Sequence, residues 1–591
     1  MFAARALALL ACGAAVGFVS NGAGAFSLQD RDGSAEKANE SYAAGIEALK
    51  RQDLANARKK FEETVRLAPE SAEAHNSLGY VLLLTGEAGG AARELRSATR
   101  LKPSFAQAHA NLANALLQKG SATEAIQEAR EAVRLAPSNP DAHRALGRSL
   151  NGARDLAGAV DAILKGVELN PDSAELRDDL GVLLVNQGKS SEAAEQFSAA
   201  IKIAPDATDA AFHLGVLYYE QKKFGAARNL LGQSVRARPR NGLAQYYLGL
   251  AERDLGDAAG AITAFEASVK LQPSNETAQK QLGLLLQRSG RIEEAVNVFR
   301  EKAKRHPEDG EAHNDLGLAL LEAGDAVGAI SEFQNALKLK PGDVGYETNL
   351  GAAHLQKADF LAAAKQFESA LEKAPNNPTL HYDLGLALKL QDKLPEAVVE
   401  FRKAEALDPA QPDAPYTLGV TLWQQGDFEA AATELRAAIH AKPDYAEAFY
   451  TLGTVLKQQG KLQESATALR EALRLEPDFA GAHTTLAGVL RQLGDAEGAA
   501  AEAHAGAELA KRKTDLQAAL FATNSGKRLR NAGDLEGAVS QFRSAINAAH
   551  DFAPAHYELG VALLRQGKKE EATREFAEAK TLDPKLVVPG N

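Results

Sequence analysis

The chain has 591 residues, enough for several globular domains, but its composition is narrow. Strong helix formers such as Ala, Leu, Glu and Lys dominate, aromatic residues make up 6%, and Cys, Met and Trp occur once each. With 67 Lys and Arg against 78 Asp and Glu, the net charge is −11. This balance argues against a nucleic-acid binder, because binding phosphates requires a basic face. We therefore expect an almost entirely α-helical protein with no nucleic-acid partner.

Residues 1–25 have the form of a secretory signal peptide. An early Arg5 precedes a largely apolar run over 6–19, and Ala23-Gly24-Ala25 is a small-x-small cleavage pattern. The run is too short to be a membrane-spanning helix. This interpretation predicts a periplasmic or secreted protein whose mature chain has no cysteine, and hence no disulfide, thiolate nucleophile or cysteine-bound metal.

An alternative interpretation of the same segment centres on Cys12. The stretch Leu9-Leu10-Ala11-Cys12 resembles a bacterial lipoprotein box, in which the cysteine is acylated and becomes the first mature residue. Under this interpretation the protein is a membrane-anchored lipoprotein. Neither interpretation leaves a transmembrane span in the mature chain, since no later segment is long and apolar enough.

Beyond a mostly polar stretch at 26–37, which we expect to be a flexible linker, the sequence repeats itself. A Leu-Gly pair stands nine and ten residues after nearly every one of thirteen prolines spaced 34 residues apart. This period defines fourteen repeats over 38–513, an insertion at 514–518, two repeats over 519–586 and a tail at 587–591. The prolines are at positions 69, 103, 137, 171, 205, 239, 273, 307, 341, 375, 409, 443 and 477.

The residue type at five positions within the repeat has a physical explanation. Position 8 is Gly in fourteen repeats, position 20 is Ala in fifteen, and position 24 is mostly Phe or Leu. Gly inside a helix costs about 1 kcal/mol relative to Ala, so its recurrence predicts a second helix packed closely against the first. Gly at position 15 suits a turn between the helices, and Pro at position 32 ends the second helix. Each repeat is therefore a helix pair, over about positions 1–14 and 17–30.

The pattern resembles the tetratricopeptide repeat. In the repeat over 310–343 it is carried by Leu316-Gly317, Ala329, Phe333 and Pro341. The resemblance covers 38–586 and implies an all-α fold, a right-handed α-solenoid superhelix of about sixteen helix-turn-helix repeats with a concave groove. Helices this short are marginal alone, so the repeats must stack. Position 4, often Trp in that family, is His in seven repeats, where we expect a ring packed at the core edge.

The period breaks after repeat 14. Lys511 replaces the closing proline, the five residues 514–518 are inserted, and the run 495–521 contains no Pro and only two Gly. One interpretation is that the second helix of repeat 14 merges with the first helix of repeat 15, so that the last two repeats rotate. The other is a slightly longer loop with normal stacking.

No catalytic, cofactor or metal-binding pattern accompanies the repeats. The sequence has no HExxH and no GxSxG motif. The position-4 histidines of stacked repeats are expected about 10 Å apart, too far to share one zinc ion. Enzymes with such arrays need an additional catalytic domain, and only 587–591 follow repeat 16. We therefore expect a protein that is not an enzyme.

Positions 5, 9 and 12 of the first helix share one face, which in this family lines the concave groove. Tyr and Trp are typical interface anchors, and here they form clusters in repeats 6–7 and 11–13. For each tyrosine, the alternative is simple packing against the neighbouring helix. The candidate partner-binding residues are Asn76, Asn114, Phe212, Tyr219, Tyr246, Asn314, Tyr382, Tyr416, Trp423 and Tyr450.

The function that these observations favour is a non-catalytic, exported protein–protein interaction scaffold that binds peptide or protein partners in its groove. The alternative is an envelope-anchored assembly factor, a lipoprotein of a pilus, secretion or polysaccharide export system, as some proteins with similar repeats are. The identity of the partner and the oligomeric state do not follow from the sequence.

Overall fold

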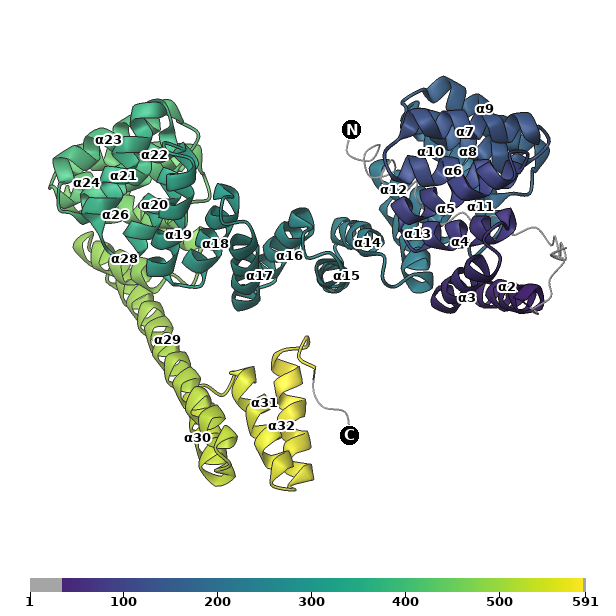
Figure 1. Cartoon of the computed structure of the whole chain (residues 1–591). Coiled ribbons are helices and arrows are strands. Elements are labelled where there is room, and N and C mark those ends of the chain that lie inside the picture. The colour runs from purple at the N-terminus through teal and green to yellow at the C-terminus, as the bar shows by residue number, and fades with distance from the viewer. Residues whose placement is uncertain (1–33, 588–591) are drawn as a thin grey trace. The chain divides into compact units, whose positions relative to one another are not determined.

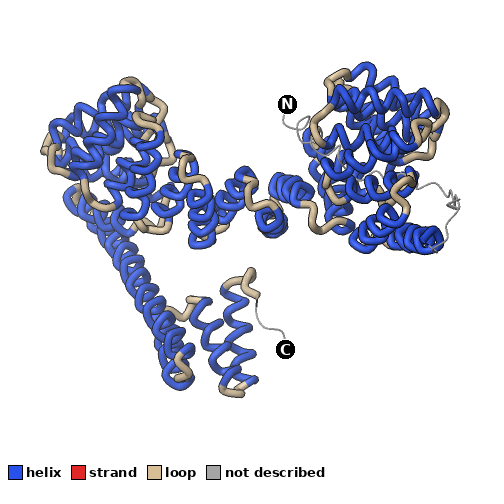
Figure 2. The backbone as a smooth tube through the Cα atoms, in the orientation of Figure 1, coloured by secondary structure: helices blue, strands red, loops and turns tan. Residues whose placement is uncertain are grey.

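The computed structural model describes residues 34–587, in which helices, turns and short loops are the only structure and no strand occurs (Figure 2). The predicted signal peptide, Cys12 and most of the expected linker lie outside the described residues. The first described helix begins at Ser34, so residues 34–37, expected to belong to the linker, are helical. None of the helices within 34–587 combines the length and hydropathy needed to cross a membrane.

The chain divides into two compact parts, and the first ends at Arg305. In the first part, consecutive helices pair as the 34-residue period predicts, and repeats 1 to 8 are complete (Figure 1). Its helices are α2 (Ser34–Lys50), α3 (Leu54–Leu67), α4 (Ala72–Leu84), α5 (Ala88–Leu101), α6 (Ala106–Gln118), α7 (Ala122–Leu135), α8 (Pro140–Gly152), α9 (Leu156–Leu169), α10 (Ala174–Asn186), α11 (Ser190–Ile203), α12 (Thr208–Glu220), α13 (Phe224–Ala237), α14 (Gly242–Asp254), α15 (Ala258–Leu271), α16 (Glu276–Arg288) and α17 (Ile292–Arg305).

The second part contains repeats 9 to 16. Its helices are α18 (Gly310–Glu322), α19 (Ala326–Leu339), α20 (Val344–Gln356), α21 (Phe360–Lys373), α22 (Pro378–Leu390), α23 (Leu394–Leu407), α24 (Asp413–Gln424), α25 (Phe428–Ala441), α26 (Ala446–Gln458), α27 (Leu462–Leu475), α28 (Ala480–Gln492), α29 (Ala496–Asn531), α30 (Leu535–Ala548), α31 (Ala553–Arg565) and α32 (Lys569–Leu582). The predicted all-α solenoid of paired helices is confirmed.

The core confirms the reason given for glycine at position 8. A Cβ placed on Gly317 would lie 2.5 Å from a ring carbon of Phe333, and one on Gly385 would lie 2.6 Å from Phe401. Both phenylalanines, at position 24, are completely buried. The two repeats with Ala at position 8 also have Ala at position 24, so in them two methyl groups replace the large ring. The glycine and the ring are therefore one packing unit.

The turn inside every repeat requires a left-handed backbone at position 15. Eleven repeats place glycine there, and in the other five a non-glycine residue adopts a φ of +59° to +66°. After α4, the amide of Gly86 donates to the carbonyl of Leu83 and that of Glu87 donates to Leu82, a Schellman ending. The turn is thus imposed by the helix pair, since it persists where no glycine favours it. The five non-glycine residues are Gln52, Arg154, Lys222, Ala358 and Asp392.

The position-4 histidines do more than pack at the core edge. His109 contacts the Glu128 carboxylate through Nδ1 (2.6 Å) and the Pro103 carbonyl through Nε2 (3.1 Å). Because both partners can only accept, the imidazole satisfies both contacts only when doubly protonated. The hydrogen bond to Glu128 raises the pKa of His109 against the opposing effect of burial. The same two contacts, to a glutamate and to the carbonyl six residues earlier, recur at His75, His313, His381, His483 and His556.

At the break in the period, the merged helix is observed and the loop is not. Helix α29 runs without interruption for 36 residues, about 54 Å. Its first part packs against α28 and its last part against α30 (Figure 1). Repeat 15 consequently lacks the cover that a preceding repeat provides. Its position-3 residue, Phe521, is 72% exposed, whereas Ala210 and Ala555 at the same position are completely buried.

Candidate partner-binding face

Within each compact part, first helices of neighbouring repeats contact each other along one face. We call it the first-helix face and define it by positions 5, 6, 9 and 12. Its polar side chains pair across the helix boundary with a constant spacing of 35 residues. Asn111 Nδ2 donates to Asn76 Oδ1 (2.9 Å), and Asn349 Nδ2 donates to Asn314 Oδ1 (2.8 Å). Further pairs in this register are Tyr42–Ser77, Arg144–Asp179, Asp178–His213 and Tyr382–Thr417.

This pairing changes the role of two predicted residues. Asn76 is buried and its amide oxygen is already bonded, so it joins repeat 2 to repeat 3. Asn314 joins repeat 9 to repeat 10 in the same way. Asn114 is half-buried at position 9 and makes no hydrogen bond through its side chain with the rest of the described chain. The sequence-based prediction did not include position 6. Complementary residues 35 positions apart in the sequence would have indicated this pairing.

The aromatic residues of repeats 6 and 7 form a closed cluster, which consists of Phe212, Tyr219, Tyr246 and Tyr247. Phe212 is 2% exposed and lies edge-on to Tyr247, with ring centroids 6.1 Å apart. Tyr247 also contacts Tyr219 at 6.1 Å and Tyr246 at 5.4 Å. For Phe212, packing is the role that the structure shows.

One hydroxyl of the closed cluster, that of Tyr219, is bonded within the protein. The hydroxyl of Tyr219 donates to the Asp254 carboxylate at 2.8 Å. Arg253 Nε donates to the same carboxylate at 2.7 Å. Burial, followed by the hydrogen bond to Asp254, raises the pKa of Tyr219, and burial raises the pKa of Tyr247 to about 12. These phenols stay neutral at physiological pH, and Tyr219 remains a hydrogen-bond donor to Asp254.

The aromatic residues of repeats 11 to 13 form an open cluster, which consists of Tyr382, Tyr416, Trp423 and Tyr450. All four are half-buried. Tyr416 lies against Tyr445 with ring centroids 4.9 Å apart, and Tyr450 lies against Phe479 at 4.7 Å. The indole nitrogen of Trp423 donates to Gln458 Oε1 at 2.5 Å. Contacts within the protein thus fix these side chains, while part of each ring remains accessible to solvent.

The open cluster contains donors without acceptors. The hydroxyls of Tyr416 and Tyr450 make no hydrogen bond to any described residue. At position 12 of repeats 11, 13 and 14, Lys389, Lys457 and Arg491 likewise form no ion pair within the described chain. Burial lowers the pKa of Lys389. The half-buried face therefore has unused donors and positive charge beside aromatic rings.

Acidic groups also occur on this face, on the side where the first helices begin. Asp413 and Glu447 occupy position 2 and are exposed, and Asp383 occupies position 6. Burial raises the pKa of Asp383 to about 6. Positions 2 and 12 are about 15 Å apart along a helix, so the acidic and basic rows form opposite margins of the aromatic row.

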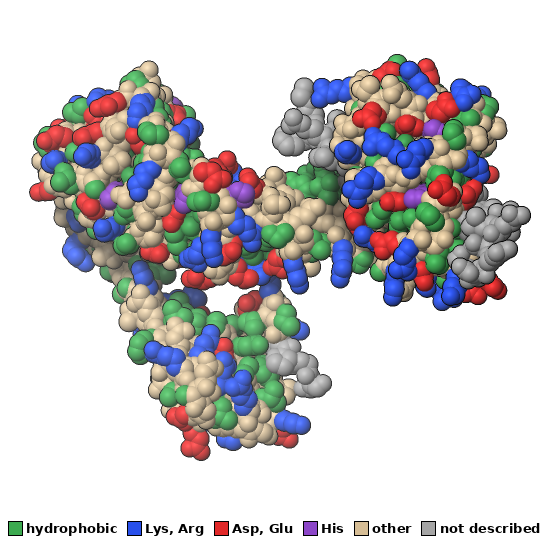
Figure 3. All heavy atoms as spheres, in the orientation of Figure 1, with side chains coloured by type: hydrophobic (Ala, Val, Ile, Leu, Met, Phe, Trp, Pro, Cys, Tyr) green, Lys and Arg blue, Asp and Glu red, His purple; other side chains and the backbone are tan. Residues whose placement is uncertain are grey.

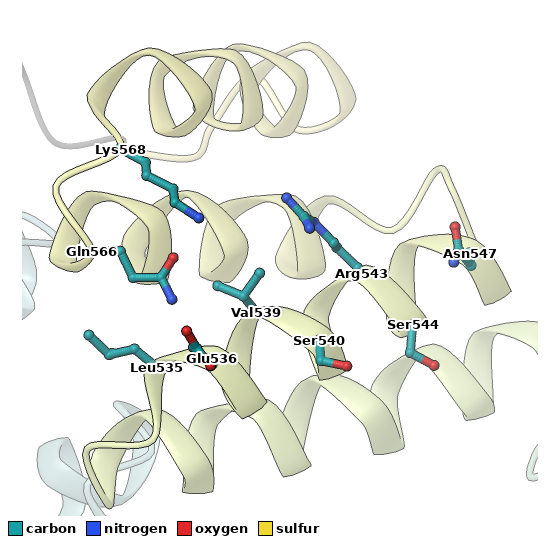
Figure 4. A pocket seen from close by; sticks show the side chains of 9 residues that line it. All are labelled: Leu535, Glu536, Val539, Ser540, Arg543, Ser544, Asn547, Gln566 and Lys568. Atoms are coloured by element: carbon teal, nitrogen blue, oxygen red, sulfur yellow. The ribbon is translucent and has the colours of Figure 1, made fainter.

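A surface depression lies beside the second helix of repeat 15 (Figure 4). It is open, has a volume of about 910 Å³ and includes no aromatic side chain. Arg543, which lines it, is also paired with Glu571 at 3.3 Å. We therefore place the candidate site on the first-helix face. The depression is lined by Leu535, Glu536, Val539, Ser540, Arg543, Ser544, Asn547, Gln566 and Lys568.

The surface chemistry elsewhere is mixed. On the face shown in Figure 3, basic and acidic side chains are interspersed over both parts of the chain. Within residues 34–587, no group of three or more His, Cys, Asp or Glu side chains is arranged to hold a metal ion.

Solved structures similar to this chain include other helical repeat proteins. The Cut9–Hcn1 hetero-tetramer of APC/C is 14% identical, with 77% of this chain and 96% of that chain covered and a TM-score of 0.33. The pilF protein of Pseudomonas aeruginosa is 21% identical, with 36% and 96% covered and a TM-score of 0.32. YrrB, described as having an unusual peptide-binding site, is 27% identical, with 31% and 95% covered and a TM-score of 0.24. At such TM-scores these likenesses carry no argument about function.

Comparison of the sequence with known families gives a clear result. No curated protein matches it. The family model for the tetratricopeptide repeat matches ten segments, at residues 42–104, 85–140, 110–174, 179–231, 218–276, 280–344, 348–412, 416–466, 450–511 and 523–586. These segments cover nearly all of the repeats, and the chain therefore belongs to the tetratricopeptide-repeat family.

Proposed function

We propose that the protein is a non-catalytic interaction scaffold whose partner binds on the first-helix face of repeats 11 to 13. The observation that carries this proposal is the open cluster, where aromatic rings and unpaired donors share one half-buried surface. Because these rings already pack against neighbouring side chains, they lose little conformational entropy when a partner binds. The repeats supply a preformed surface, and the partner supplies the missing acceptors.

Site-specific photo-crosslinking tests the proposal. A benzophenone amino acid replaces Val420, which lies at position 9 among the four aromatic residues, and cells are irradiated. We expect a discrete crosslinked partner, and we expect its loss when Tyr382, Tyr416 and Tyr450 are all changed to Ala. The matched control places the same amino acid at Val399, 52% exposed on the second helix of repeat 11. A partner captured equally from Val399, or retained by the triple variant, would contradict the proposal.

We further propose that the scaffold is exported, as the form of residues 1–25 predicts. Cleavage after Ala25 gives a periplasmic or secreted protein that begins at Phe26. The second candidate function, an envelope-anchored assembly factor, requires acylated Cys12 as the first residue. Mass spectrometry of the mature N-terminus separates the two, and an intact Met1 in the mature protein would contradict both.

A further inference from the structure

The open cluster has a regular spacing that restricts what can bind to it. Tyr382, Tyr416 and Tyr450 occupy position 5 of three consecutive first helices, at intervals of 34 residues. Neighbouring packed helices lie about 8–10 Å apart, so a tyrosine recurs about once every 10 Å along the stack. A ligand that contacts all three in the same way must present the same group at that interval.

A polyproline II helix has the matching repeat. It has three residues per turn and rises 3.1 Å per residue, so one face recurs about every 9 Å. An extended strand advances a similar distance in three residues, but its side chains alternate and the face reverses. Two turns of an α-helix also span about 11 Å, but the carbonyls inside an α-helix are already bonded and do not pair with the free hydroxyls.

The chemistry of the face agrees with the spacing. The polyproline II backbone has no internal hydrogen bonds, so its carbonyl oxygens are available to the unpaired hydroxyls of Tyr416 and Tyr450. Proline rings pack well against aromatic faces, and such segments lose little entropy because they are preformed. The unpaired Lys389, Lys457 and Arg491 along one margin favour acidic side chains at the same repeat.

We propose that the tyrosine row binds an acidic, proline-rich segment of a protein partner in the polyproline II conformation, with about one ligand turn per repeat. This inference rests on the proposed function of the same face. Tyr382 contributes its ring, because its hydroxyl is already bonded to Thr417 at 3.3 Å. Trp423 lies between the basic side chains of position 12 and provides a further flat surface.

The binding test uses the full chain and a fluorescein-labelled peptide of about twelve residues made of Pro-Pro-Glu triplets, enough for about four turns. Fluorescence anisotropy should show saturable binding. A Pro-Pro-Lys peptide and an alanine-based helical peptide with the same number of Glu residues should bind at least about tenfold more weakly. Absence of binding to Pro-Pro-Glu, or equal binding of the helical peptide, would overturn the proposal.

Variants assign the binding to the row. Tyr416→Ala should weaken Pro-Pro-Glu binding at least about tenfold, as a buried aromatic anchor does, and Tyr416→Phe by a smaller factor. The control is Tyr557→Ala, because Tyr557 also occupies position 5 and packs against its phenylalanine at the same 5.7 Å as Tyr382 does. Its neighbour at that position in repeat 15 is Thr523, so no tyrosine row exists there. Equal loss in the control would place the binding elsewhere.

A charge reversal keeps the test meaningful if a tyrosine variant is unstable. Lys389→Glu with Lys457→Glu should weaken Pro-Pro-Glu binding at least about tenfold and strengthen Pro-Pro-Lys binding. Unchanged affinities for both peptides would overturn the proposal. If crosslinking at Val420 captures a partner while the peptides do not bind, only this inference fails. If neither result appears, the proposed function fails with it.

Discussion

The closed and open clusters share first-helix positions 5 and 12 but differ in how far their rings are enclosed and in which hydroxyls are bonded. In repeats 6 and 7, Tyr219 donates to Asp254 and Phe212 is completely enclosed. In repeats 11 to 13, the hydroxyls of Tyr416 and Tyr450 have no partner in the described chain. Aromatic residues at a family's binding positions are therefore insufficient to mark a site, because neighbouring repeats can satisfy them.

The difference arises one repeat further along the chain. The residue 35 positions after Tyr219 is Asp254, an acceptor, and the residue 35 positions after Phe212 is Tyr247, a ring. The corresponding residues after Tyr416 and Tyr450 are Thr451 and Thr485. Thr451 donates to the carbonyl of Glu447 within its own helix. Neither threonine forms a hydrogen bond with the tyrosine before it, so the two tyrosine hydroxyls stay available.

The largest expected effect comes from overfilling the core beneath each cluster. A Cβ on Gly385 would lie 2.6 Å from Phe401, and one on Gly249 would lie 2.8 Å from Phe265. Gly385→Val and Gly249→Val should each lower local stability by about 2–3 kcal/mol, seen as faster hydrogen exchange in α22–α23 and α14–α15 respectively. Only Gly385→Val should also weaken partner binding. Equal loss of binding in both variants would break the comparison.

A smaller effect isolates the hydroxyl groups. Tyr219→Phe removes a hydrogen bond to a carboxylate at a half-exposed site and should cost about 1 kcal/mol of unfolding free energy. Tyr416→Phe removes a hydroxyl without a protein partner and should cost less than about 0.5 kcal/mol. Urea denaturation followed by local hydrogen exchange measures both. A cost at Tyr416 as large as that at Tyr219 would mean that its hydroxyl is bonded in solution.

The smallest expected effect is a pH dependence of stability at position 4, where some histidines have a carboxylate partner and others do not. The pKa of His109 is raised in the folded state, chiefly by Glu128, with Pro103 and Glu131 adding to it. The stabilising contribution is therefore fully present below the unfolded pKa of about 6.5 and is lost as the pH rises through the higher folded value. Protection of α6–α7 from hydrogen exchange, corrected for intrinsic rates, should fall as the pH rises above about 6.5.

The matched comparison for this pH effect is in the next repeat. His143 bonds to the Pro137 carbonyl, but Ala162 stands where Glu128 stands in repeat 3, so no carboxylate completes the arrangement. His109→Gln should remove the pH dependence in α6–α7 and leave α8–α9 unchanged. A variant that retains the full dependence would show that another group titrates.

The sequence by itself determined the helix pairs, their boundaries to within a residue or two, and the packing of glycine against a large side chain. These features repeat because each is enforced within one 34-residue repeat, by helix propensity, by a proline that ends the second helix and by the steric fit between positions 8 and 24. The family followed from the same pattern. The sequence also indicated where both aromatic clusters lie, but it did not predict which of their hydroxyls are bonded.

Only the tertiary structure decided which of those side chains remain unpaired and how the period breaks. Pairing across repeats depends on contacts between residues 35 apart and on which rotamer a neighbour adopts, as Asn76 and Tyr416 illustrate. The stretch around 514–518 is compatible with helix or loop by composition, and packing of its two ends against α28 and α30 selects the continuous helix. Local propensity is read along the chain, whereas satisfaction of a polar group is a property of its surroundings.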